Sequence, residues 1–192
     1  MTHWTFIRHG QSTANAEGWF AGHMDAPLTA RGRDEATATR EALAALAYDR
    51  VLCSDLVRAR ETAAIVTALR PAPTRVDAAL RERHCGQWEG RPVASLVTDI
   101  EVLNTFDGRP PGGESLRDVA LRALAVLHTH AAPGHVLVVG HGALMRATIG
   151  VLDGTPSSTI GAWKPKNCEW TTREADAATL ERLIATLRSE TP

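Results

Sequence analysis

The stretch HVLVVGHGALMRATIG, residues 135–150, combines three features that together indicate a fold. A short apolar run rich in valine has the length and composition of a strand buried on both faces of a parallel sheet. His141 and Gly142 follow this run directly, and the apolar residues after them continue for long enough to form a helix. The stretch therefore predicts a buried strand that delivers an imidazole to the start of a helix.

The stretch FIRHGQSTAN, residues 6–15, has the same order of elements near the start of the chain. An apolar run ends at Arg8 and His9, Gly10 follows, and polar residues come next where a helix can begin. One such unit also fits an ordinary strand that ends in a turn. Two units indicate that His9 and His141 meet, because parallel strands end at one edge of a sheet and ligands bind outside those ends. Each helix start adds unpaired backbone N–H groups, which suit an anion.

Other segments alternate between strand and helix patterns along the chain. Strands are predicted at residues 4–7, 50–54 and 135–140, with late strands at 167–173 and 178–183, the second of which fits a helix equally well. Helices are predicted at residues 30–47 after Thr29, 55–69 after Ser54, and 116–131 after Ser115, which has capping-box spacing to Asp118. The expected fold class is α/β, a single three-layer α/β/α domain over residues 1–192 with a mostly parallel central sheet.

The composition limits the classes to which the protein can belong. The chain has 192 residues, of which 44% are hydrophobic and 22% charged, enough for one domain with a sizeable core. The formal net charge of -1 leaves no broad basic surface, so neither a nucleic acid nor a membrane is an expected partner. Any bound anion must therefore meet a local cluster of cations. The oligomeric state stays open, and a homodimer is compatible with the sequence.

Cysteine usage and hydropathy predict the compartment. Cys53, Cys85 and Cys168 are odd in number, far apart and unlike a Cys-x-x-Cys pair, so we expect reduced thiols in the core. No targeting segment is evident before the first predicted strand, and no apolar run approaches the roughly 18 residues of a membrane helix. These features predict a cytoplasmic protein.

The stretch SDLVRARETA, residues 54–63, offers further cations at the same sheet edge, because its helix begins where the strand at 50–54 ends. Arg58 and Arg60 are two positions apart, about 200° around a helix, so only one of them can face the crevice. Helical periodicity does not choose between them.

Six motifs, taken in order, resemble those of the histidine phosphatases, the phosphoglycerate mutase-like superfamily. They span most of the chain, and together they are far more specific than any one of them alone. The motifs are RHGQSTAN (8–15), AGHMDAPLTARGRDEA (21–36), CSDLVRARETA (53–63), LRERHCGQWEG (80–90), PGGES (111–115) and VVGHGALMR (138–146).

The resemblance implies a role for each matched residue. His9 is the implied nucleophile and Glu82 the implied acid and base, with Arg8, His141 and Arg58, rather than Arg60, completing the catalytic set. The residues implied to bind substrate are Gln11, Ser12, Asn15, Ala21, Gly22 and Gly142. The resemblance also implies a phosphoglycerate mutase-like fold in which residues 83–131, approximately, form a helical cap-like insertion over the site. Cys85 departs from the family, whose members usually carry an aromatic residue there; the change can loosen packing beside Glu82 but removes no catalytic group.

Phosphoryl transfer explains why these residue types would be needed. A phosphomonoester dianion repels nucleophiles and hydrolyses extremely slowly without a catalyst. Arg8 and Arg58 can grip its oxygens through planar guanidinium groups, with His141 and Asn15 assisting. We expect the two arginines to lower the pKa of His9, which keeps the ring neutral for attack, and a backbone carbonyl to fix its tautomer. The product of the attack is a phosphohistidine.

No cofactor and no catalytic metal are expected. The eight histidines lack a metal-ligand spacing at the predicted site, and the one close pair, His128 and His130, is expected near an exposed helix end.

Hydrolysis of a small phosphomonoester is favoured over a mutase reaction. A mutase holds a second anionic group, which calls for additional cations after Glu82. Between Trp88 and Ser115 the sequence supplies two arginines and an excess of carboxylates: Arg91 and Arg109 against Glu89, Asp99, Glu101, Asp107 and Glu114.

The substrate itself is left open. The stretch GHMDAPLTARG is especially similar to α-ribazole phosphatases and also to broad-specificity phosphatases. Trp19, Phe20 and Met24 could line an apolar lip for a bulky leaving group or could pack in the core. A phosphoglycerate mutase-type transfer and a non-catalytic module that binds a phosphorylated ligand are the alternative functions. The module is disfavoured because His9, Glu82 and His141 are all present.

Overall fold

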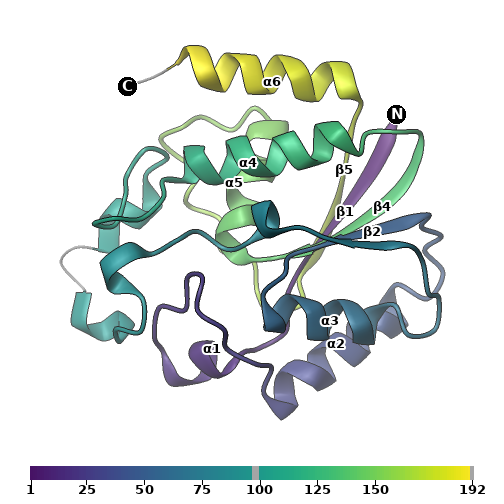
Figure 1. Cartoon of the computed structure of the whole chain (residues 1–192), viewed down its shortest axis with the longest axis horizontal. Coiled ribbons are helices and arrows are strands. Elements are labelled where there is room, and N and C mark those ends of the chain that lie inside the picture. Colours follow the sequence, from purple (N-terminus) through teal and green to yellow (C-terminus); the bar gives the residue numbers. More distant parts are fainter. Residues whose placement is uncertain (97–99, 191–192) are drawn as a thin grey trace.

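The computed structural model describes residues 1–96 and 100–190, so Asp99, counted above among the carboxylates, lies outside the described residues. Its centre is a five-stranded sheet in the order β3-β2-β4-β1-β5 (Figure 1). The strands are β1 (Thr2–Arg8), β2 (Arg50–Cys53), β3 (Thr74–Val76), β4 (Gly134–Gly140) and β5 (Trp170–Ala175). Four are mutually parallel and β5 runs antiparallel to β1, which confirms the α/β class and the mostly parallel sheet.

Alternate residues of the central strands point into two separate cores. Phe6 and Val138 belong to the larger core, whereas their neighbours Ile7 and Val139 belong to the smaller one, and all four are buried. This alternation follows from the two-residue period of a strand, and burial on both faces explains the near-continuous apolar runs in the sequence.

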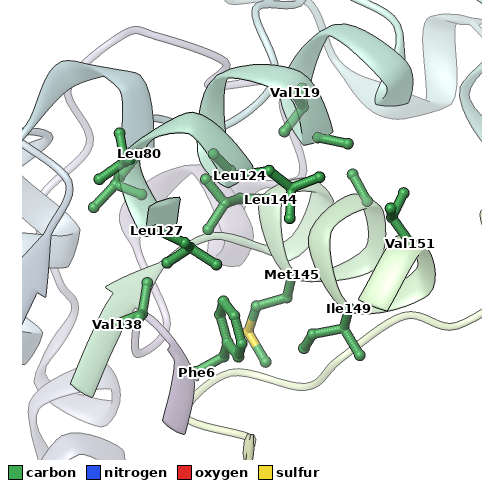
Figure 2. Packing of buried hydrophobic residues seen from close by; sticks show 14 of the residues in the cluster. Phe6, Leu80, Val119, Leu124, Leu127, Val138, Leu144, Met145, Ile149 and Val151 are labelled. Carbon is green, nitrogen blue, oxygen red and sulfur yellow. The ribbon is translucent and has the colours of Figure 1, made fainter. Parts of the chain in front are cut away.

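Helices cover both faces of the sheet, as predicted for three layers (Figure 1). Residues of α4 (Leu116–Thr129), α5 (Gly142–Leu152) and α6 (Ala177–Ser189) complete the larger core, and residues of α2 (Ala30–Ala42) and α3 (Val57–Val66) complete the smaller one. Figure 2 shows Leu124 of α4 and Met145 of α5 packed together with Phe6 in the larger core.

The predicted caps are largely confirmed. Thr29 caps α2, and Ser115 forms the predicted capping box with Asp118 at the start of α4. The third cap was wrong: α3 begins at Val57 after Leu56, which makes no side-chain cap, and the Ser54 hydroxyl instead accepts a hydrogen bond from the Leu56 N–H.

Two elements differ from the sequence prediction. Residues 178–183 form part of α6, so the helical alternative is correct; the apolar residues Leu180, Ile184 and Leu187 recur at helical spacing and face the core. Strand β3 was not predicted, because all three of its residues are exposed and carry no burial pattern.

The predicted insertion over residues 83–131 needs a correction at its C-terminal end. Its first part holds the short 3₁₀ helices η2 (Gly86–Trp88), η3 (Val93–Leu96) and η4 (Ile100–Asn104). Buried side chains of all three form a small third core around Trp88 and Leu103. By contrast, α4 is a helix of the main core rather than of a cap, because its apolar face packs against α5 and α6.

The remaining expectations concern cysteines and membrane helices. Cys53, Cys85 and Cys168 are free and buried, as predicted, and burial raises the pKa of the Cys53 and Cys85 thiols to about 12. Among the described residues, no helix has the length and apolar character needed to span a bilayer.

Truncation of Leu124 tests the packing of the larger core. Leu124 is fully buried between α4 and its neighbours, so Leu124→Ala should lower the free energy of unfolding by about 2–5 kcal/mol. Leu69→Ala is the matched control, because the Leu69 side chain is 72% exposed and should cost far less. Urea unfolding followed by circular dichroism measures both; similar losses would contradict this account of the core.

Candidate active site

The two predicted histidines lie side by side at the carboxyl edge of the sheet. Arg8 at the end of β1 pairs in register with Gly140 at the end of β4, and the His9 N–H donates to the Gly140 carbonyl at 2.9 Å. The next residues along the two strands are therefore brought together. The His9 and His141 rings meet edge to face with their centroids 5.2 Å apart, and both are buried.

The environment of His9 fixes both its tautomer and its charge. Nδ1 lies 2.7 Å from the Gly10 carbonyl oxygen, which can only accept, so Nδ1 carries the proton and Nε2 keeps its lone pair. Burial lowers the pKa of His9 well below its usual value, and the charges of Arg58 and Arg8 lower it further. The prediction of a neutral ring is consistent with this geometry, although burial contributes more to the lowered pKa than the two arginines on which the prediction rested.

A close approach of two backbone segments holds the His9 loop. A Cβ atom on Gly10 would clash with the carbonyl oxygen of Gly32 in the first turn of α2, so glycine is needed for this contact. The Gly10 N–H donates to the Thr62 hydroxyl of α3 at 3.1 Å, and the Asn167 amide donates to the His9 carbonyl at 3.1 Å. The loop is thus fastened from three sides.

His141 has one ring nitrogen without a partner. Nε2 lies 2.8 Å from the Ser54 hydroxyl, which already accepts from the Leu56 N–H and so can donate its own proton to Nε2. That arrangement places the ring proton on Nδ1, which is buried and has no hydrogen-bond partner among the described residues. Burial, followed by the charge of Arg58, lowers the pKa of His141 well below its usual value.

Two arginines flank the histidines, and the structure resolves the choice that helical periodicity left open. Arg58 is buried and lines the cavity, whereas Arg60 is exposed. The Arg58 guanidinium donates to the Gly22 and Met24 carbonyls at 2.8 and 2.9 Å, which orients it. Arg8 donates to a backbone carbonyl through Nη1, while its buried Nε has no partner among the described residues.

Glu82 is held at the start of α5. Its Oε1 accepts from the backbone N–H of Arg83 at 2.8 Å and of Ala143, in the first turn of α5, at 3.0 Å. Its backbone is held as well, because Arg122 of α4 donates to the Glu82 carbonyl at 2.9 Å and to the Arg81 carbonyl at 2.7 Å. The carboxyl group thus faces the cavity from a fixed position.

A cavity of about 310 Å³ opens at this edge of the sheet. Four of the five residues predicted to be catalytic line this cavity: Arg8, His9, Arg58 and Glu82. The fifth, His141, is fully buried beside His9. Most residues predicted to bind substrate also line it: Ser12, Asn15, Ala21, Gly22 and Gly142.

Gln11 is the one residue of the predicted substrate-binding set that is not among the residues lining the cavity, and its predicted role stays a prediction. Its side-chain carbonyl accepts from the Thr29 hydroxyl at 2.9 Å and its N–H donates to Glu35 at 2.8 Å, so Gln11 joins the loop to α2 instead of lining the cavity.

The structure also places the aromatic residues that the sequence left open. Trp19 and Phe20 line the cavity, and Phe20 packs against Trp88 with ring centroids 5.9 Å apart. Met24 is 44% exposed and lies outside the lining. The cavity therefore has an apolar wall beside its cationic one.

Three cations at the cavity were missed by the sequence analysis: Arg83, Arg146 and Lys164. One signal could have found Arg146, which follows Gly142 by four residues and so lies one helical turn further on the same face. Lys164 lies on the loop between α5 and β5, and no local sequence pattern indicates that this loop reaches the cavity. Within the described residues, no group of three or more His, Cys, Asp or Glu side chains is arranged to hold a metal ion.

Comparisons with known proteins agree on one family. The family model described as the histidine phosphatase superfamily (branch 1) matches residues 4–183. The 2,3-bisphosphoglycerate-dependent phosphoglycerate mutase 2 of Gloeobacter violaceus is 38% identical over 161 residues, which are 77% of this chain and 74% of the mutase. The adenosylcobalamin/alpha-ribazole phosphatase of Escherichia coli is 31% identical over 191 residues, 95% of this chain and 92% of that protein.

A solved structure gives the same result. A mycobacterial glucosyl-3-phosphoglycerate phosphatase, determined in complex with VO3, superposes with a TM-score of 0.83 at 30% sequence identity. The match covers 88% of this chain and 91% of the mycobacterial one.

Burial of the two neutral rings predicts the pH dependence of stability. Below about pH 6.5 the unfolded chain binds protons at His9 and His141, whereas both rings stay neutral in the folded chain because their pKa values are lowered. The free energy of unfolding should therefore fall as the pH drops below about 6.5. Each ring contributes a slope of up to about 1.4 kcal/mol per pH unit. Denaturant unfolding across this pH range should show a shallower slope for His9→Asn than for the unsubstituted protein. His128→Asn removes an exposed ring as a control; if both variants or neither change the slope, burial of His9 is not its cause.

Proposed function

The chain belongs to the histidine phosphatase superfamily (branch 1), and we propose that it is a metal-independent phosphatase that hydrolyses a small phosphomonoester through a phosphohistidine at His9. Family membership confirms the resemblance seen in the six sequence motifs. The phosphatase reaction, its substrate and the role of each residue are parts of the proposal.

One observation carries this proposal. A neutral imidazole with its Nε2 lone pair free lies beside buried donors that have no partner among the described residues, Nε of Arg8 and Nδ1 of His141. Buried donors without partners cost free energy unless a ligand satisfies them. A phosphoryl group supplies acceptor oxygens for these donors and the electrophile for His9, and the guanidinium groups of Arg8 and Arg58 offset its charge.

The reaction divides into two displacements at phosphorus. In the first, His9 Nε2 forms a bond to phosphorus while the bond to the ester oxygen breaks, and the Glu82 carboxyl group donates a proton to that oxygen as the alcohol leaves. In the second, Glu82 takes a proton from water as the water oxygen bonds to phosphorus and the N–P bond breaks. Inorganic phosphate leaves, and both His9 and Glu82 return to their starting states.

Phosphoglycerate mutase-type transfer is the second candidate. Its support is the identity to the Gloeobacter violaceus mutase together with Arg83, Arg146 and Lys164 at the cavity, cations that the sequence analysis did not count. Arg91 and Arg109, the two arginines considered from the sequence, are poor candidates for binding a second anionic group. Arg91 lies outside the cavity lining, and Arg109 pairs with Asp118 at 3.0 Å. Hydrolysis is placed first because the phosphatase relatives match over more of the chain.

Removal of the nucleophile tests the covalent mechanism. His9→Ala should abolish turnover of p-nitrophenyl phosphate, assayed in EDTA to exclude a contribution from divalent ions, because no other group can accept the phosphoryl from this position. Rapid quenching of the unsubstituted enzyme at alkaline pH, followed by mass spectrometry, should find phosphate on His9. His128→Ala is the control and should keep full turnover. Near-normal turnover by His9→Ala, or dependence of the unsubstituted enzyme on a metal, would contradict the proposal.

Substitution of Glu82 tests proton transfer. Glu82→Gln should lower the rate about 10²–10⁴-fold with an alkyl phosphate, whose leaving oxygen needs a proton. With p-nitrophenyl phosphate the first displacement should be much less affected, because p-nitrophenolate is stable without the proton. Phosphohistidine should then accumulate and a burst of p-nitrophenolate should precede slow turnover. Equal losses on both substrates without a burst would mean that Glu82 is structural.

A further inference from the structure

A cluster of cations lies in the same cavity as the proposed nucleophile but takes no part in the two displacements. Arg83 follows Glu82, Arg146 belongs to α5, and Lys164 lies on the loop between α5 and β5. Together with Arg8 and Arg58 they give the cavity five cationic side chains, against Glu82 as the one carboxylate among the described lining residues. The net positive charge of these lining side chains is larger than the negative charge of a single phosphoryl dianion.

Arg83 and Arg146 have no carboxylate at salt-bridge distance among the described residues, and the charge of Glu82 acts on both only from further away. The Arg83 side chain is only 3% exposed, and Arg146 is also largely covered, yet neither forms a salt bridge with any described residue. Burying a charge without a counter-ion is costly, so a bound anion would stabilise both side chains.

Each guanidinium group retains donors for a ligand. Arg83 makes one side-chain hydrogen bond to a described residue, from Nη1 to the Leu103 carbonyl at 3.2 Å, and its buried Nε has no partner. Arg146 likewise makes one, from Nη1 to the Gly161 carbonyl at 3.0 Å. A guanidinium group has five N–H donors, so most remain available on both side chains.

The backbone contacts hold these two arginines in fixed positions. Arg83 is anchored to η4 through Leu103, and Arg146 is anchored to the loop that carries Lys164 through Gly161. The two walls touch, because a Cβ atom on Gly161 would clash with the Asn104 carbonyl. Asn104 itself lines the cavity, next to the apolar residues Ile100 and Leu103 of the same helix. The cations are therefore part of a built wall of the cavity.

We propose that Arg83, Arg146 and Lys164 form a second anion subsite, so that the substrate is a phosphomonoester carrying a further carboxylate or phosphate group away from the transferred phosphoryl. This inference rests on the proposed function and narrows its substrate class. Burial and the nearby charge of Arg83 lower the pKa of Arg146 to about 10, so Arg146 stays charged at neutral pH and gains from a neighbouring anion. An α-ribazole phosphate, which has no second anionic group, would leave the subsite unused.

Matched ligands that differ only in the distal group test the proposal. Alkyl phosphates of increasing chain length are prepared with a terminal carboxylate or a terminal hydroxyl, and a third series carries a second phosphate. We expect kcat/KM to be at least about 10-fold higher for a carboxylate or phosphate ester than for its hydroxyl counterpart at one chain length, because charge-assisted hydrogen bonds discriminate by about this factor. Comparison of the two anionic series shows which group the subsite accepts.

Substitutions of the subsite residues test whether they cause a preference for substrates with a distal anionic group. Arg146→Gln and Lys164→Gln should each reduce the ratio of anionic to hydroxyl substrate several-fold, mainly through KM, and Arg146→Lys should restore part of it. Lys166→Gln is the matched control, because Lys166 lies two residues further along the same loop, is exposed and does not line the cavity. Lys166→Gln removes the same charge as Lys164→Gln, and it should leave unchanged both the activity and the ratio of kcat/KM for anionic and hydroxyl substrates.

Binding of non-hydrolysable phosphonates separates this inference from the proposed function. Calorimetric titration with the carboxyl- and hydroxyl-terminated phosphonates measures the preference without turnover. A binding preference that is lost in Arg146→Gln supports the subsite, even if no ester is hydrolysed and the phosphatase proposal fails. Ratios within about twofold at every chain length, or a preference unchanged by Arg146→Gln, overturn the subsite while leaving phosphatase activity intact.

Discussion

The parallel pairing of β1 with β4 is the constraint on which the site depends. Because Arg8 lies opposite Gly140, the residues that follow each strand, His9 and His141, leave the sheet next to one another. The neighbouring strand β2 ends at the same edge, since the Ser54 N–H donates to the Val139 carbonyl, and this brings Ser54 to His141. A shift of this register by one residue would exchange the two faces of the strand and separate the rings.

Burial at this edge sets the chemistry as much as the identity of the side chains does. The two rings are neutral because water is excluded from them, and the arginines around them raise the cost of protonation further. The same exclusion makes the unpaired donors of Arg8 and His141 costly in the free protein. An anion bound there would accept hydrogen bonds from these donors, and such binding would stabilise the folded state.

Glu82 illustrates how segments distant in the sequence hold one carboxyl group of the cavity in a fixed position. Its carboxylate accepts from the first turn of α5, while its backbone is held by Arg122 of α4. Arg122 is itself oriented by Glu114, at 2.9 Å. The position of the carboxyl group thus depends on the packing of α4 against α5 in the larger core, which couples that core to the site (Figure 2).

The sequence by itself determined the buried strands of the sheet, the helical layers on both of its faces and the pair of histidines, because strand periodicity and the repeated strand-His-Gly-helix pattern are local signals. It also carried the motifs that established the family. Only the tertiary structure decided that Gln11 turns away toward Thr29 and that Arg83, Arg146 and Lys164 share one cavity. Even the choice of Arg58 over Arg60, which the family motif implied, could not be derived from helix geometry alone. The physical reason is the same in each case: which way a side chain faces at a loop or a helix end depends on the segments packed against it, and these come from elsewhere in the chain.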